Sequence, residues 1–521
     1  MKHKTTLLAI VFSCICSMLS GQRTFFSTYE APDGYRAASS VYIPGDFIIS
    51  GGHTSSFGAV GQDMLLVKTD IEGNFHWARK IGSDRDENIV SLIYTSTNKI
   101  AVLADDQVFN PYIHSFLLLD TSGNILVSRS FSFDGIPYHQ SSNLIELING
   151  DFLYSAVTQD GVVLVSLDNA GQTNWTRKFT TDINPAPYIY SIKAAQISGG
   201  KIALACTGSA GFSAMDEILL LIIDNAGNYH SAHQYNSTVH LEANGIFYSS
   251  NPDKIYIAGT ANSSRFFAMQ LDTSGTIHWS IAYLSTYMSY VGCYAAAFNP
   301  INKEISFVGG PSGGGFEIAK LDSSGNYIWS QGSNGFVEFP SSIFYEPAGS
   351  LVITGYTTTT LTTNYNQFHC KLLSDGTRCN VAYNITGYNS GYSAIHSSSS
   401  FTLNGPFTLS DSAIVFNNQF ETLNRIVDCD VQVSVDKSLD IDPLEINLIV
   451  VKKQLEVIIN REFQEGALLS IFDLNGKLLS KAKPYRGSFK YLVELGAFSD
   501  GQYFLVFEQG VEKISKRFIL R

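Results

Sequence analysis

The chain has 521 residues, of which 45% are hydrophobic and only 15% are charged, and it contains 43 glycines, 27 tyrosines and 34 phenylalanines. This composition favours a β protein with many turns over a helical enzyme. The formal net charge of −12 argues against a nucleic acid partner, because binding phosphates requires a basic surface.

The N-terminus has the features of an export signal. Two lysines precede an apolar run at residues 7–16, and small residues at positions 20 and 21 come just before Gln22. This pattern predicts a secretory signal peptide over residues 1–21. A lipoprotein cut at Cys14 or Cys16 is the competing interpretation. No other segment is long and apolar enough to predict a transmembrane helix.

A short phrase recurs along the next four hundred residues: Asp, two residues, Gly, three residues and often Trp. Full copies begin at Asp70, Asp272 and Asp322, degenerate copies at Asp120, Asp168 and Asp224, and a seventh centres on Asp375. The turn glycines follow one another at steps of 48 to 56 residues. Repeats of about 40–50 residues built from strands are typical of β-propellers. The sequence therefore predicts an all-β fold with a β-propeller over residues 22–428.

Each unit holds four short apolar strands, which is the number in a propeller blade. Seven copies of the phrase predict seven blades, and a worn eighth unit at Phe401–Val427 is the alternative. The segment Thr24–Tyr29 lies where a strand after the turn would fall, so we expect it to complete the last blade. In the phrase itself, we expect Gly to take a left-handed turn conformation and Asp to cap the turn. Trp would fill the gap between adjacent blades.

Strand direction separates the short turns from the long, variable loops. Strands alternate in direction within a blade, so the long loops all emerge on the face opposite the Asp turns, where binding is usually found. The candidate ligand-binding residues of this face are Tyr112, Tyr138, His139, Tyr188, Tyr287, Tyr290 and Tyr365. Such side chains can stack on sugars or anchor a protein partner. The alternative is that they pack only against their own loops.

No catalytic, metal or cofactor motif stands out in the sequence, and we assign no residue to these roles. His230, His233 and His240 are better explained as solvated or packed side chains than as metal ligands. The first functional hypothesis is a non-enzymatic propeller that binds a glycan or a protein. An extracellular polysaccharide hydrolase or lyase with carboxylates at the central channel is the second, and a structural surface-layer component is the third.

Five cysteines follow the signal peptide, an odd number that leaves at least one thiol unpaired within the chain. Cys206 and Cys293 lie in apolar, strand-like runs and are predicted to be buried thiols. Cys379 and Cys429 could clip the end of the repeat region, although the disulfide connectivity among the five cysteines, which include Cys370, cannot be read from the sequence.

The last part of the chain changes in character. Residues 429–443 form an acidic, polar linker, and residues 444–521 carry 12 Lys and Arg against 9 Asp and Glu. Six short strands in this region predict a separate, small immunoglobulin-like β-sandwich. Its phrases are LEVIIN from Leu455, SIFDLNGKLL from Ser470, LGAFSDGQYFLVF from Leu495 and the terminal KISKRFILR.

These phrases resemble the C-terminal sorting domain of the type IX secretion system found in Bacteroidetes. The chain departs from that family at the front, where Ile441-Asp442-Pro443 stands in place of the usual Tyr-Pro-Asn-Pro. The resemblance implies Sec export, passage through the outer membrane by the type IX machinery, and then release or attachment at the cell surface. The repeat region is similar to the secreted propellers that often accompany such tails.

Overall fold

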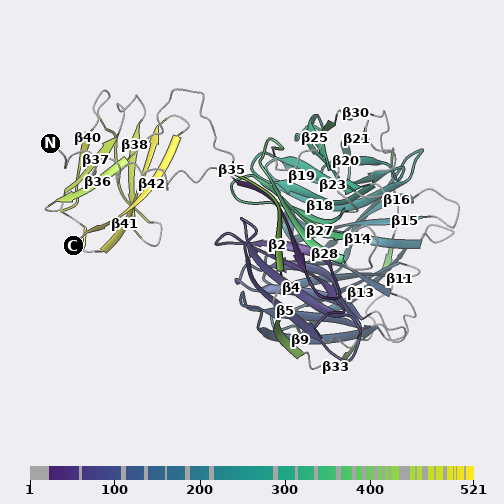
Figure 1. The fold of residues 1–521 in the computed structure, drawn as a ribbon. Coiled ribbons are helices and arrows are strands. Elements are labelled where there is room, and N and C mark those ends of the chain that lie inside the picture. The colour runs from purple at the N-terminus through teal and green to yellow at the C-terminus, as the bar shows by residue number, and fades with distance from the viewer. Residues whose placement is uncertain are drawn as a thin grey trace. The chain divides into compact units, whose positions relative to one another are not determined.

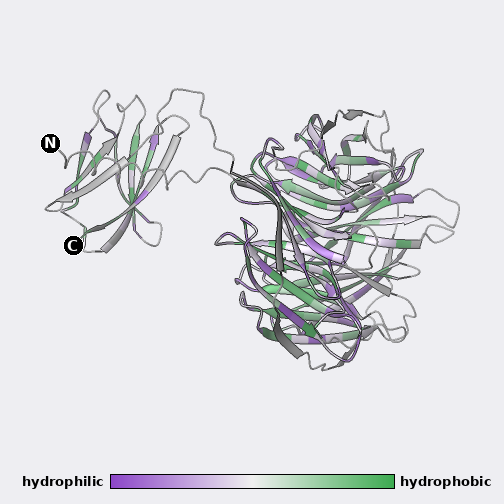
Figure 2. Cartoon of the chain, viewed as in Figure 1, coloured by the Kyte–Doolittle hydropathy of each residue, from purple (hydrophilic) through white to green (hydrophobic). Residues whose placement is uncertain are grey.

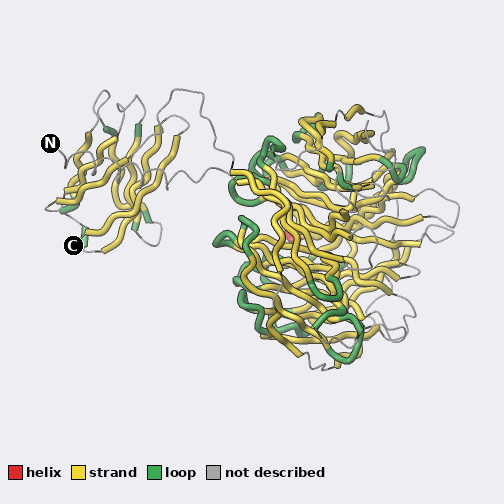
Figure 3. Tube along the Cα trace, viewed as in Figure 1, coloured by secondary structure: helices red, strands yellow, loops and turns green. Residues whose placement is uncertain are grey.

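The computed structural model describes residues 23–432 and 446–520, with short gaps, the longest at 107–112, 182–187, 210–215, 286–291, 359–364 and 460–466. The chain divides into two compact units, Met1–Ser434 and Val435–Arg521. Nearly all described residues are in strands or their connections, apart from one 3-10 turn, η1 (Ser198–Gly200), as Figure 3 shows. The predicted signal peptide lies outside the described residues.

The first unit is a β-propeller of seven blades (Figure 1). Blade 1 holds β2 (Tyr35–Ile43), β3 (Phe47–Thr54), β4 (Asp63–Asp70) and β5 (Phe75–Gly82). Blade 2 holds β6 (Glu87–Tyr94), β7 (Ile100–Asp106), β8 (His114–Leu119) and β9 (Ile125–Phe133). Blade 3 holds β10 (His139–Glu146), β11 (Phe152–Thr158), β12 (Gly161–Leu167) and β13 (Thr173–Thr181). Blade 4 holds β14 (Tyr188–Ile197), β15 (Lys201–Ser209), β16 (Asp216–Asp224) and β17 (Tyr229–Asn236).

The remaining blades follow the same order. Blade 5 holds β18 (Leu241–Ser250), β19 (Asp253–Ala261), β20 (Arg265–Leu271) and β21 (Ile277–Ser285). Blade 6 holds β22 (Gly292–Asn299), β23 (Glu304–Gly310), β24 (Glu317–Leu321) and β25 (Tyr327–Gly332). Blade 7 holds β26 (Glu338–Tyr345), β27 (Leu351–Thr358), β28 (Tyr365–Leu372) and the N-terminal strand β1 (Arg23–Glu30), which pairs antiparallel with β28. The prediction that Thr24–Tyr29 completes the last blade is confirmed.

The first strand of each blade lies nearest the propeller axis. These seven strands contact one another in a closed series, β2 to β6, β6 to β10 and onward to β26, which contacts β2 again. Between neighbouring blades lie seven hydrophobic clusters, each built from two blades, such as the cluster that joins Leu220 of blade 4 to Met269 of blade 5. Figure 2 shows the hydrophobic residues along the blade strands. The core is therefore divided into interfaces between blades.

A belt of short strands at residues 383–432 surrounds the seven blades. Each belt strand pairs antiparallel with the outermost strand of one blade, in the order of blades 6, 5, 4, 3, 2, 1 and 7. The belt strands are β29 (Tyr383–Ile385), β30 (Gly387–Asn389), β31 (Ile395–Ser398), β32 (Phe401–Leu403), β33 (Leu409–Ser412), β34 (Asn417–Glu421) and β35 (Asn424–Gln432). Figure 1 shows one such pair, β33 beside β9. The alternative of an eighth unit at Phe401–Val427 is therefore wrong, because these strands extend existing blades.

The second unit consists of two antiparallel sheets. One contains β36 (Ile446–Val451), β37 (Gln454–Ile459) and β40 (Lys490–Glu494), and the other contains β39 (Leu478–Ala482), β38 (Leu468–Phe472), β41 (Gly501–Gln509) and β42 (Glu512–Leu520). Side chains from both sheets form one hydrophobic cluster that includes Leu455, Leu469 and Phe507. This arrangement agrees with the predicted small sandwich.

Candidate functional site

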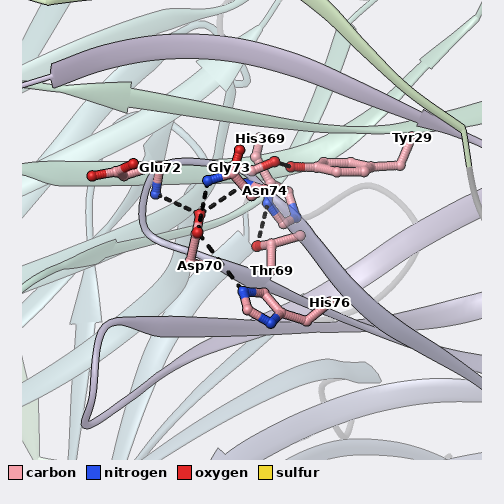
Figure 4. A network of polar contacts seen from close by, with 8 residues as sticks. All are labelled: Tyr29, Thr69, Asp70, Glu72, Gly73, Asn74, His76 and His369. Atoms are coloured by element: carbon pink, nitrogen blue, oxygen red, sulfur yellow. Dashed lines mark hydrogen bonds and ion pairs between the residues drawn. The ribbon is translucent and has the colours of Figure 1, made fainter.

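The recurring Asp and Gly shape the turns. The Asp70 carboxylate accepts backbone N–H groups from Glu72 at 3.0 Å and Asn74 at 2.7 Å, and Gly73 has φ 77° (Figure 4). Equivalent bonds recur at Asp120, Asp168, Asp224, Asp272 and Asp322. In the seventh copy, Leu373 occupies the Asp position of the turn, and Asp375 accepts the N–H of Thr377 instead. The structural interpretation of Asp and Gly is confirmed.

The tryptophans join each blade to the next. The rings of Trp77, Trp175, Trp279 and Trp329 pack against the turn glycines Gly123, Gly227, Gly325 and Gly376 of the following blades. A Cβ added at Gly227 would lie 2.8 Å from the Trp175 ring, and the Trp175 indole donates to the Asn225 carbonyl at 3.0 Å. The predicted wedge between blades is confirmed, and the phrase is structural.

The face opposite these turns carries the connections after the second and fourth strands of each blade; we call it the long-loop face. Near this face, every first strand contains a β-bulge at an equivalent position. The bulged residues are Ala38, Val90, Ser142, Tyr190, Asn244, Tyr294 and Ser341. Bulges at a rim re-aim side chains and are often found beside functional sites. Two groups of described side chains lie at this end of the first strands.

The first group is an aromatic platform formed by Arg36, Phe339, Tyr356 and Tyr365. Phe339 stacks on Tyr356 with ring centroids 5.0 Å apart, and Tyr365 meets Tyr356 edge-on at 5.4 Å. Arg36 belongs to β2 of blade 1, and its guanidinium lies 4.7 Å from the ring centroid of Tyr356 and 5.7 Å from that of Tyr365. Its Nη2 donates to the Tyr356 hydroxyl at 2.9 Å. The platform therefore spans blades 7 and 1.

Tyr294 of blade 6 extends this surface. Tyr294 is 42% exposed. Its pKa is raised, mainly because the phenol is partly buried and to a smaller extent because the phenol of Tyr356 lies nearby. Arg36 is exposed and the other three platform residues are half-buried. The rings therefore keep part of their surface open to solvent beside a fixed positive charge.

The second group is polar and lies on blades 4 and 5. Asn244 donates to the Glu242 carboxylate at 3.2 Å. Burial raises the pKa of Glu242, and the negative charge of Asp216 raises it further. The hydrogen bond from Asn244 and the positive charge of Lys193 lower it, but they do not outweigh the first two effects. Burial likewise raises the pKa of Tyr190, with added contributions from Asp216 and Glu242. In this polar group the carboxyl groups of Asp216 and Glu242 lie close enough for the charge of Asp216 to raise the pKa of Glu242.

Lys193 connects the polar group to the propeller axis. Burial lowers the pKa of Lys193, and the negative charge of Glu242 opposes that change, with a further contribution from the Cys293 side chain. These three residues lie on the first strands of blades 4, 5 and 6 in succession, so their mutual influence agrees with strands that converge at the axis. The ionisable residues near the axis therefore include one cation and at least one acid.

Of the predicted binding residues, Tyr365 lies in the aromatic platform. His139 and Tyr188 begin the strands β10 and β14. Tyr112, Tyr138, Tyr287 and Tyr290 lie outside the described residues. The sequence patterns did not indicate Arg36, Phe339 or Glu242, which each stand two residues before a bulge on a first strand. The bulges are defined by strand register, so no local sequence signal marks these positions.

The histidines named from the sequence have separate partners. His240 lies 3.1 Å from the Asp216 carboxylate, His230 lies 2.6 Å from Lys201, and the ring of His233 packs on the turn at Gly275. Within the described part of the chain, no three His, Cys, Asp or Glu side chains are grouped to hold a metal ion. Cys206 and Cys293 are buried free thiols, as predicted, and Cys370 is a third. Cys379 lies outside the described residues.

Comparison with known proteins identifies the tail. Residues 451–521 match the family model of the secretion system C-terminal sorting domain. The tail is a type IX sorting domain. The chain is therefore exported, and it is secreted or attached to the cell surface. In the part of the chain that the structure describes, no helix is long and apolar enough to cross a bilayer. No curated protein matches the chain.

Several solved structures resemble the propeller at low sequence identity. A protein of unknown function from Dyadobacter fermentans is 9% identical, covers 68% of this chain and 99% of its own, and gives a TM-score of 0.39. An α-L-arabinanase from Penicillium chrysogenum, complexed with arabinobiose, is 10% identical over 68% of this chain and 98% of its own, with a TM-score of 0.39. The periplasmic gluconolactonase PpgL of Pseudomonas aeruginosa is 9% identical over 76% and 100%, with a TM-score of 0.38. At these scores the likenesses carry no argument about function.

Proposed function

We propose that the protein is an exported, non-enzymatic propeller that binds a glycan on its long-loop face, through the aromatic platform. One observation carries this proposal: Tyr356, Tyr365 and Tyr294 present partly exposed rings beside Arg36 at the rim of a rigid ring of blades. Aromatic rings offer a large apolar area, while phenol groups supply hydrogen bonds to the hydroxyls of a sugar. The sorting tail supports a site that works outside the cell.

Binding of the mature full-length protein to a glycan array tests this proposal. Tyr294→Ala, Tyr356→Ala and Tyr365→Ala should each weaken binding at least tenfold, while the melting temperature stays near that of the wild type. Tyr229→Ala is the matched control, because Tyr229 is 40% exposed on the outer strand β17 of blade 4, directly after the Asp turn and therefore at the face opposite the long loops. Wild-type affinity in all three tyrosine variants would overturn the proposal. If the protein bound a surface protein and no glycan, the ligand would be a protein and the assignment to glycans would be wrong.

The polar group supports a second candidate, hydrolysis of a polysaccharide. A glycosidase needs one carboxyl group held protonated and a second that is ionised. Glu242, with its raised pKa beside Asp216, has the first of these properties. The release of reducing ends from polysaccharides, compared between the wild type and Glu242→Gln, tests this candidate. Activity that is present in the wild type and lost in the variant would favour an enzyme, whereas no activity in the wild type would favour the binding protein.

A further inference from the structure

Arg36 is a cation without an acidic partner, in a strongly acidic part of the chain. Residues 22–443 carry 20 Lys and Arg against 37 Asp and Glu. Three buried lysines of the blades are paired: Lys80 with Asp63 at 3.3 Å, Lys320 with Glu304 at 2.6 Å, and Lys371 with Glu346 at 3.0 Å. Arg36 forms no such pair with any described carboxylate, and its bonds are those with the Tyr356 hydroxyl and the two rings.

The segments that flank the platform residues in the chain also lack acidic side chains. The segments that connect the strands of Phe339, Tyr356 and Tyr365, residues 334–337 and 359–364, contain no Asp or Glu. The same holds for residues 286–291, which precede β22 and Tyr294, and for residues 55–62 of blade 1. Glu30 and Asp33, the acids nearest in sequence, form no ion pair with Arg36. Among the residues that the structure describes, no ion pair therefore neutralises this guanidinium.

The platform holds the guanidinium in place while leaving most of its donors unused. A guanidinium has five N–H donors in a planar fork, and the Tyr356 hydroxyl takes one of them. Stacking over tyrosine rings fixes the plane of the fork and lowers the entropy that is lost when an anion binds. Two parallel N–H groups fit a carboxylate in bidentate fashion.

The nearby ionisable groups at this end of blade 1 include His53 and Asp86. His53 bonds to Asn88 at 2.8 Å; burial lowers its pKa and the charge of Arg36 lowers it further, while the Asn88 bond and the negative charge of Asp86 oppose that change. Arg36 is a permanent positive charge at this side of the rim. Tyr294 and Tyr356 lie beside it as partly exposed rings.

We propose that the platform selects sugars that carry a carboxylate, with Arg36 binding the carboxylate and the tyrosines stacking on the sugar ring. The inference rests on the proposed glycan-binding function, and it adds the class of ligand: an oligosaccharide that contains uronic acid. A bidentate arginine–carboxylate bond is directional, whereas a neutral hydroxyl offers a single oxygen and cannot fill both arms of the fork.

Calorimetry with the mature full-length protein tests the inference against three probes: a hexamer of galacturonic acid, the same hexamer as its methyl ester, and a sulfated galactan oligosaccharide of equal length. The wild type should bind the acid at least tenfold more tightly than the ester. Arg36→Gln should remove that preference and keep the weaker affinity for the ester. Arg36→Lys should recover only part of it, because an ammonium lacks the planar fork.

The outcomes separate this inference from the proposed function. An unchanged acid-to-ester ratio in Arg36→Gln, or equal binding of acid and ester by the wild type, overturns the role of Arg36 while glycan binding stands. Tighter binding of the sulfated probe than of the acid overturns the assignment to carboxylates. If neither these probes nor any neutral glycan of the array binds, the proposed function fails as well. Unchanged melting temperatures of the two Arg36 variants show that a loss is not a loss of folding.

Discussion

Tyr29 donates a hydrogen bond of 2.6 Å to the carbonyl of Gly73, 44 residues further along the chain (Figure 4). The bond joins β1, the last strand of blade 7, to the Asp turn of blade 1. Tyr235 and Gly275, and Tyr283 and Gly325, form the same bond at ordinary blade interfaces. The ring is therefore closed by the same tyrosine–carbonyl hydrogen bond that joins consecutive blades. His369 of blade 7 adds hydrogen bonds to two residues of blade 1, Ser50 at 2.8 Å and Thr69 at 3.2 Å.

Tyr29→Phe should lower the free energy of unfolding by about 1–2 kcal/mol, because it leaves the buried Gly73 carbonyl without this donor. Denaturant unfolding followed by tryptophan fluorescence measures the loss. Tyr42→Phe is the control, since Tyr42 bonds locally to Asp46 on the surface and should change stability by less than about 0.5 kcal/mol. Equal losses in both variants would contradict a special role for the closing bond.

Gly227→Ala should be more damaging than Gly349→Ala. Both glycines have positive φ, 76° and 86°, so alanine costs about 1 kcal/mol of backbone strain at either site. At Gly227 the new Cβ also meets the Trp175 ring at 2.8 Å, whereas nothing lies within 4 Å at Gly349. We expect a further loss of about 1–3 kcal/mol from overpacking. A partial recovery in the double variant Gly227→Ala, Trp175→Leu would confirm the origin of the loss.

The Asp turns should make the propeller sensitive to acid. Burial alone raises the pKa of Asp120, Asp224 and Asp272, but hydrogen bonds from nearby N–H and hydroxyl groups outweigh it, and the pKa of each is lowered. A lowered pKa in the folded state gives stability that is present above the unfolded value of about 3.9 and is lost as the pH falls through the folded value. The melting temperature should therefore fall below about pH 4.

The triple variant with Asn at positions 120, 224 and 272 should flatten this pH dependence, because the amide does not titrate. Glu72→Gln serves as the control, since Glu72 lies exposed on a turn of the same kind. Melting curves between pH 7 and pH 2 decide the question. A triple variant with the same acid slope as the wild type would show that other groups cause the loss.

Removal of the belt should cause aggregation. A chain that ends at residue 377 leaves the outermost strands of all seven blades without their belt partners, and exposed strand edges pair with other molecules. A chain that ends at residue 434 keeps the belt, loses only the tail domain, and is the control. Light scattering during storage should show an increase in particle size for the shorter chain and none for the control. A shorter chain that stays monomeric would show that the belt does not protect the edges.

The three buried thiols should be inert in the folded protein. Burial raises the pKa of Cys206 to about 12 and raises that of Cys293 as well, so the reactive thiolate is scarce at neutral pH. A variant that lacks residues 1–21 and carries Cys379→Ser and Cys429→Ser should bind no alkylating reagent at pH 8 until it is unfolded in guanidinium, and should then bind three equivalents. Labelling of Cys206 in the native state would contradict the packing of this interface.

The sequence alone determined the repeating unit, because turn chemistry and strand patterning are local. The spacing of Gly73, Gly123 and the later turn glycines predicted the blades, the Asp and Trp positions predicted the turn and the wedge, and the phrases around Ser470 and Leu495 predicted the sorting tail. Tyr365 was predicted on the correct face because strand direction follows from the order of turns.

Only the tertiary structure decided what the repeat does not encode. The belt arises from pairings of three to eight residues between strands that lie from 51 to 409 positions apart in the chain, so no local pattern distinguishes it from a worn blade. Arg36 meets Tyr356 because ring closure brings residues 320 positions apart into contact. Glu242 and Lys193 influence each other because neighbouring first strands converge at the axis. The short repeat thus fixed the scaffold, and closure of the ring created the candidate site on the face that carries no copy of the repeat.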